Sequence, residues 1–149
     1  MKALFNKIEL IARQFPQEIL TIVARLAIAS VFWRSAQTKI AGGEVFGQKW
    51  QFYNVTDSTF MLFEYEYALP IIPHQIAAYL ATFAEFTLSL TIILGLLTRL
   101  SALGLLVMTT VIQFLVYPDA WPTHILWLVP LLYLIKHGGG QLSIDRLFK

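Results

Sequence analysis

Three ionisable residues interrupt otherwise apolar stretches of this 149-residue sequence, and they are the first guide to its chemistry. Arg25 and Arg34 lie in one stretch, and Glu85 lies near the middle of another. A charge in apolar surroundings is costly unless a partner neutralises it, so such residues usually face the protein interior. Arg25 and Glu85 lie at similar depths in their stretches, so we predict that they form an ion pair.

Helical spacing suggests which other side chains accompany this pair. Arg25, Phe32 and Lys39 follow at intervals of seven residues and share one face, whereas Arg34, about 900° of rotation after Arg25, lies on the opposite face. We predict a polar pocket among the helices with the candidate residues Arg25, Glu85, Lys39, Gln113 and Arg34. Arg34 lies nearer the outer surface than Arg25, where its long side chain can reach water or meet the acidic loop.

Two interpretations of the Arg25–Glu85 pair remain open. The pair can serve only to set the register of two helices, which small residues around Glu85 would bring close together. These small residues are Ala78, Ala81, Thr82 and Ser89. Alternatively, the pair can line a pocket for a quinone head group or hold a proton-accessible carboxyl group.

The histidines and nearby aromatic residues form a second group of candidates. Tyr117, Trp121 and His124 lie close together in the sequence and are candidates for an outer-surface site. His74 lies on the same outer side as His124, but the spacing of the two is not diagnostic of a metal site. A haem within the membrane would need two histidines that face each other inside the bundle, which this sequence does not supply. We therefore predict no metal site. The absence of cysteine excludes a disulfide and a thiolate ligand.

The composition indicates the elements that position these residues. The sequence is 57% apolar and only 13% charged, with a mean hydropathy of +0.64, whereas soluble domains are about 45–50% apolar and about a quarter charged. Stretches over about 19–40, 74–97, 100–116 and 122–136 are long enough, or nearly so, to cross a bilayer. We predict an all-α, polytopic four-helix membrane bundle formed by a single domain, residues 1–149, with a kink at Pro130.

The distribution of basic residues predicts the orientation. Only Lys39 and Lys49 flank the spans on one side, where a loop over about 41–73 is also acidic. The basic residues on the other side are Lys2, Lys7, Arg13, Arg99, Lys136, Arg146 and Lys149. The positive-inside rule then places both termini in the cytoplasm and the long loop in the periplasm.

The first fifteen residues are expected to form a separate amphipathic helix. Leu4, Ile8 and Ile11 recur at helical spacing, with Lys7 and Arg13 elsewhere around the helix. This pattern is typical of a helix that lies along the membrane surface. An amphipathic cap packed against the bundle fits the same pattern, and both interpretations remain open.

Several segments resemble the DoxX family of small bacterial membrane proteins. They are R-L-A-I-A-S-V-F-W-R-S-A-Q-T-K at 25–39, E-Y-A-L-P at 66–70, A-E-F-T-L-S-L-T-I-I-L-G-L-L-T-R at 84–99, Y-P-D-A-W-P-T-H at 117–124 and L-S-I-D at 142–145. The resemblance implies a four-helix membrane protein in which Arg25, Phe32, Lys39 and Glu85 match the family pattern. It also implies association with redox or metal-handling systems.

Three functional classes fit these features. The first is an accessory subunit of the bacterial inner membrane, associated with redox chemistry, for which a quinone is the candidate cofactor. The second is a non-enzymatic anchor or assembly factor for a redox-stress or metal-handling complex, and the third is a small transporter. The expected partners are the lipid bilayer and either another protein or further copies of this chain. A net charge of +2 without a basic cluster argues against nucleic acid, and no motif supports an enzyme acting alone.

Overall fold

The computed structural model describes residues 1–148, apart from the side chains of residues 3 and 11–13. The expectations for Ile11, Arg13 and Lys149 therefore fall outside the described residues. The elements, in chain order, are α1 (Lys2–Arg13), α2 (Gln17–Lys39), β1 (Glu44–Val45), β2 (Gln48–Lys49), α3 (Asp57–Met61), η1 (Leu62–Tyr67), α4 (His74–Leu94), α5 (Thr98–Val111), η2 (Ile112–Val116), η3 (Pro118–Ala120), α6 (Trp121–His137) and η4 (Ile144–Phe148).

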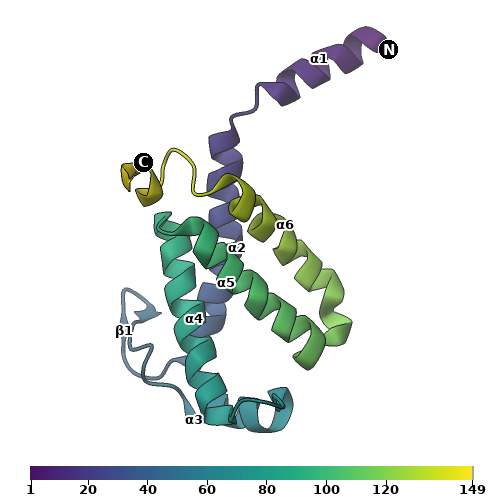
Figure 1. Cartoon of the computed structure of the whole chain (residues 1–149). Coiled ribbons are helices and arrows are strands. Elements are labelled where there is room, and N and C mark those ends of the chain that lie inside the picture. The colour runs from purple at the N-terminus through teal and green to yellow at the C-terminus, as the bar shows by residue number, and fades with distance from the viewer. Residues whose placement is uncertain (149) are drawn as a thin grey trace.

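Within residues 1–148, four long helices pack in a ring, with α2 against α4 and α6, and α5 against the same two helices (Figure 1). The largest core cluster lies between them and includes Ile28, Phe32, Leu105, Leu131 and Leu134. Both chain ends lie at one end of the bundle, which we call the terminal end (Figure 1). The opposite end, which carries the segment between α2 and α4, is called the loop end.

The prediction of an all-α membrane protein is confirmed at the level of its helices. Among the described residues, α2, α4 and the continuous helix Thr98–Val116 are long and apolar enough to cross a membrane. Their outward-facing apolar side chains, such as Val23, Leu80 and Val107, are exposed, as expected for a surface in contact with lipid. Helix α6 contains 17 residues and is shorter than those three, so a fourth crossing stays a prediction.

The turn between α4 and α5 is tight, as the sequence predicted. Helix α4 ends at Leu94, three residues earlier than expected, because Gly95 adopts a left-handed conformation with φ of 68°. Glycine commonly ends helices in this way because it carries no Cβ. Leu97 also has a positive φ, 48°, and α5 begins immediately after it.

The long loop is more ordered than the sequence indicated. It contains the β1–β2 hairpin, α3 and the π-helix η1, none of which we predicted. Gln37 of α2 fixes the hairpin through two hydrogen bonds: its Oε1 accepts from the Lys49 amide at 2.6 Å, and its Nε2 donates to the Lys49 carbonyl at 3.1 Å. The Thr56 amide then donates to the Lys39 carbonyl at 2.9 Å. The loop therefore lies against the end of α2.

Helix α1 projects away from the bundle beyond the start of α2 (Figure 1). Its apolar side chains Leu4, Phe5, Ile8 and Leu10 are exposed. An amphipathic cap packed on the bundle, one of the two interpretations of this segment, does not match this arrangement. The position of α1 along a membrane surface stays a prediction.

Candidate functional site

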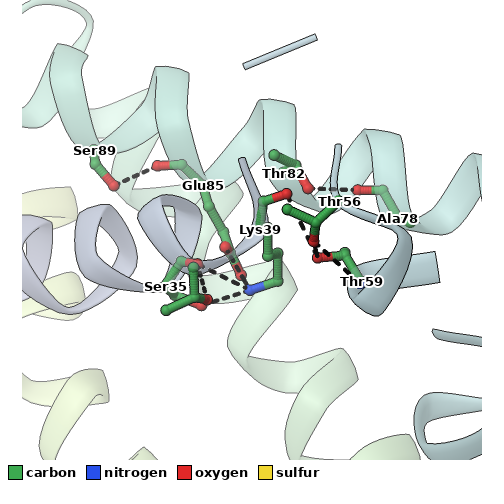
Figure 2. Close-up of polar contacts among 9 residues, drawn as sticks. Ser35, Lys39, Thr56, Thr59, Ala78, Thr82, Glu85 and Ser89 are labelled. Atoms are coloured by element: carbon green, nitrogen blue, oxygen red, sulfur yellow. Dashed lines mark hydrogen bonds and ion pairs between the residues drawn. The ribbon is translucent and has the colours of Figure 1, made fainter. Parts of the chain in front are cut away.

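Glu85 forms its ion pair with Lys39. The Lys39 Nζ donates to the two carboxylate oxygens of Glu85 at 2.9 and 3.1 Å, and to the Ser35 hydroxyl at 2.7 Å (Figure 2). Both charged side chains are only 5% exposed. Helices α2 and α4 pack against each other. Of the four small residues predicted around Glu85, Ala78, Thr82 and Ser89 are buried and Ala81 is half-buried.

The predicted Arg25–Glu85 pair is therefore wrong, and the direction of helical side chains explains the error. Side chains lean toward the N-terminus of their own helix. The long Lys39 side chain consequently runs back toward Ser35 and into the bundle, where it meets Glu85. The Arg25 side chain leans the same way, which carries it away from Glu85 and toward the terminal end.

Arg25 instead binds four backbone carbonyl groups. Its Nε donates to the Ile92 carbonyl at 2.9 Å and its Nη2 to the Ile93 carbonyl at 2.5 Å. Its Nη1 donates to the carbonyls of Gly139 at 3.0 Å and Leu142 at 2.6 Å. The last carbonyls of a helix lack intrahelical partners and carry partial negative charge, so a guanidinium group is well suited to the end of α4. Arg25 thus joins α2, α4 and the C-terminal segment.

Acidic side chains hold the same C-terminal segment in place. The Asp145 carboxylate accepts hydrogen bonds from the amides of Leu97 at 2.6 Å and Thr98 at 2.9 Å, and so caps the start of α5. The Glu18 Oε2 accepts from the Gln141 amide at 2.7 Å. We call residues 138–148, held by Arg25, Asp145 and Glu18, the C-terminal clasp. The sequence offered no signal for these contacts.

The other two candidate pocket residues lie apart from Lys39 and Glu85. Arg34 is exposed on the opposite face of α2, as its spacing from Arg25 indicated, so it does not line a shared pocket. Gln113 lies in η2, where its Oε1 is 2.7 Å from the His124 Nδ1 and its Nε2 donates to the Pro118 carbonyl at 2.7 Å. Of the five residues that we predicted to form one pocket, only Lys39 and Glu85 meet.

A second polar cluster lies at the loop end. The Tyr117 hydroxyl donates a hydrogen bond to the Glu66 carboxylate, and the rings of Tyr117 and Tyr67 are 5.7 Å apart. Two causes raise the pKa of Tyr117: partial burial, which is the larger, and the hydrogen bond to Glu66. This phenol therefore remains a neutral donor. The other two candidates for the outer-surface site lie in different surroundings. His124 is buried against Trp127, whereas Trp121 is exposed.

With this geometry in view, comparison with known proteins gives a clear result. The DoxX family model matches residues 20–118, which is about two thirds of the sequence. The chain belongs to the DoxX family. A protein of Haemophilus influenzae described as uncharacterised is 28% identical over 136 residues, which cover 86% of this chain and 82% of that protein. No solved structure matches the chain.

The DoxX match divides the structural features in two. The ion pair, Arg25 and the carbonyls of Ile92 and Ile93 lie inside the matched residues, whereas helix α6 and the C-terminal clasp lie beyond them. In this DoxX protein Arg25 therefore joins the matched residues to a segment that lies beyond the match.

A cluster of aromatic side chains that the sequence did not reveal lies on the two helices of the DoxX ion pair and on the loop between them. Phe86, the neighbour of Glu85, contacts Trp33 at 5.0 Å and stacks on Phe52 at 5.1 Å between ring centroids. Trp50 from the loop lies 6.0 Å from Phe86. These residues come from α2, the loop and α4, up to 53 positions apart in the sequence. No local sequence pattern could therefore have revealed the cluster.

Two histidines of the DoxX chain, His74 and His124, each contact one polar side chain. The His74 Nε2 lies 3.9 Å from the Glu64 carboxylate, while His124 contacts Gln113. Among the described residues, no three side chains of His, Cys, Asp or Glu gather in a group that could hold a metal ion.

Proposed function

We propose that this DoxX protein is an accessory subunit of the bacterial inner membrane, associated with quinone-linked redox chemistry, and that it is not an enzyme by itself. The observation that carries the proposal is the buried Lys39–Glu85 pair between two apolar helices. Ionisable groups within membrane-spanning segments are rare and typically functional. This pair combines a hydrogen-bond donor and a proton acceptor at one place.

The groups around the pair fit a quinone head group. An ammonium group has three protons, and the Lys39 Nζ directs them at Glu85 and Ser35. A quinone oxygen would replace the Ser35 hydroxyl as an acceptor, and the Glu85 carboxylate would remain in place to hold a proton. The rings of Trp33 and of Phe86, the sequence neighbour of Glu85, contact each other and would offer apolar faces for the quinone ring.

A second function, as a membrane anchor or assembly factor, is favoured by one observation. The pair is closed off: all three Lys39 donors have partners, and the loop residue Thr56 bonds to the Lys39 carbonyl. A sealed ion pair can serve only to set the register of α2 and α4. The two functions predict different results for a variant in which both charges of the pair are removed. Such a variant loses activity if the pair binds a quinone and keeps it if the pair only sets the helix register.

The two functions are separated by quinone analysis of variants. The protein is purified in mild detergent with its native lipids, and quinones are extracted and quantified by mass spectrometry. We expect about one quinone per protein for the unaltered chain and at least a tenfold lower ratio for the folded Lys39→Met/Glu85→Gln double variant. Arg34→Gln, which changes an exposed residue of the same helix, is the matched control and should retain quinone. A double variant with normal quinone content and normal partner-dependent activity would make the pair structural.

The proposal includes four membrane crossings with both termini in the cytoplasm. It is supported by the basic residues at the terminal end and by α6, whose packing against α2 and α5 returns the chain to that end. Single cysteines at Glu44 and Gln141, both exposed, provide a test in this cysteine-free chain. In intact cells an impermeant thiol reagent should label Glu44→Cys and not Gln141→Cys. The reverse pattern of labelling would disprove the orientation.

A further inference from the structure

A polar cleft opens at the terminal end of the bundle, away from the Lys39–Glu85 pair. Its volume is about 810 Å³, and it is enclosed by the start of α2, the start of α5 and the C-terminal clasp. Its walls include Thr21, Thr98, Arg99, Gly139 and Arg146. A space of this size can accept a phosphate group together with the small alcohol that it esterifies.

One wall of the cleft carries a polar group without a partner. Thr98 is fully buried, and its hydroxyl oxygen is the one buried side-chain polar atom of the described residues that has no hydrogen-bond partner. The same residue begins α5, where backbone amides have no intrahelical acceptors and carry partial positive charge. Asp145 accepts from the amides of Leu97 and Thr98. The amides of Arg99 and Leu100 belong to the same first turn, where a helix supplies no intrahelical acceptor.

The charges that face the cleft favour an anion. Arg99 uses one N–H to donate to the Lys136 carbonyl at 3.2 Å, and its remaining donors are available because a guanidinium group carries five. Arg146 lines the same cleft. The two carboxylates that line it, Glu18 and Asp145, already accept backbone amides, which partly neutralises them. His137 is the remaining titratable residue of the lining.

The border of the cleft is apolar, which indicates an amphiphilic ligand. Leu97, Leu100 and Phe148 line the cleft and are exposed. Leu97 and Leu100 lie where the apolar helix Thr98–Val116 begins, so a lipid whose acyl chains cover that helix would bring its head group to the cleft. A soluble anion would gain nothing from these side chains, whereas the glycerol and first methylene groups of a lipid would cover them.

We propose that this cleft binds the phosphate group of an anionic membrane lipid, with Arg99 and Arg146 as the charged contacts and Thr98 as a hydrogen-bond donor. The lipid would bridge the start of α5 and the C-terminal clasp. Binding would therefore stabilise the clasp on the bundle. This site is independent of the proposed quinone-linked function.

The test is a thermal unfolding series in a neutral detergent with three additives: phosphatidylglycerol, phosphatidylcholine and inorganic phosphate. We expect phosphatidylglycerol to raise the Tm of the unaltered protein, and the other two additives to leave it nearly unchanged. In Arg99→Gln/Arg146→Gln the apparent affinity for phosphatidylglycerol should fall at least about tenfold, and Thr98→Val should weaken it less. Arg34→Gln, an exposed arginine on a distant part of α2, should respond as the unaltered protein does.

The outcomes distinguish the sources of the phosphate. Equal stabilisation by inorganic phosphate would support a phosphate-binding site but would identify the ligand as a soluble anion and not a lipid. Equal stabilisation by both lipids, or an equal loss of response in Arg34→Gln, would overturn the proposal. If the double arginine variant does not fold, each single variant is measured, because removal of one charge should still lower the apparent affinity.

Discussion

Glu85→Gln and Lys39→Met should each lower the free energy of unfolding by about 3–5 kcal/mol, because each leaves one buried charge without its partner. Both side chains are 5% exposed and the Nζ–Oε2 distance is 2.9 Å, so water cannot easily replace the missing group. The measurement is the denaturant or thermal unfolding of purified protein in detergent.

The double variant Lys39→Met/Glu85→Gln should recover a substantial part of the loss. It removes both charges, and the remaining amide can still interact with the Ser35 hydroxyl, which lies 2.7 Å from the Lys39 Nζ. Arg34→Met is the control for loss of a positive charge from α2 and should have little effect, since Arg34 is exposed. Losses that add in the double variant would show that the two residues are not coupled.

Arg25→Met should release the C-terminal clasp and destabilise the whole bundle. Hydrogen bonds to a charged group contribute about 1.5–3 kcal/mol each, and Arg25 makes four of them, so we expect a loss above about 3 kcal/mol. Arg25→Lys should recover only part, because one ammonium group cannot reach the carbonyls of both α4 and the clasp. Unfolding is measured as for the ion pair, again with Arg34→Met as the control.

Release of the clasp has its own readout. Ser143 lies in the clasp and is half-buried, so a thiol in the Ser143→Cys variant should react slowly with a soluble reagent. In the Arg25→Met background the same thiol should react several times faster, even below the unfolding transition. An unchanged reaction rate would show that Asp145 and Glu18 hold the clasp without Arg25.

The sequence by itself determined the class of the protein and the identity of its charged core residues. Long apolar stretches can satisfy their backbone groups in a membrane only as helices, so α2, α4 and α5 were predictable from composition and length. The seven-residue spacing of Arg25, Phe32 and Lys39 correctly placed all three on the buried face of α2. It also placed Arg34 on the exposed face.

Only the tertiary structure decided which of these charges meet. The choice of Lys39 over Arg25 as the partner of Glu85 depends on the offset between two antiparallel helices and on the lean of each side chain, and neither is encoded in local spacing. The partners of Arg25 are backbone carbonyls, which every residue carries, so no residue type could reveal them. The clasp and the cleft beneath it bring together segments more than 100 positions apart, and such contacts arise only when the helices pack.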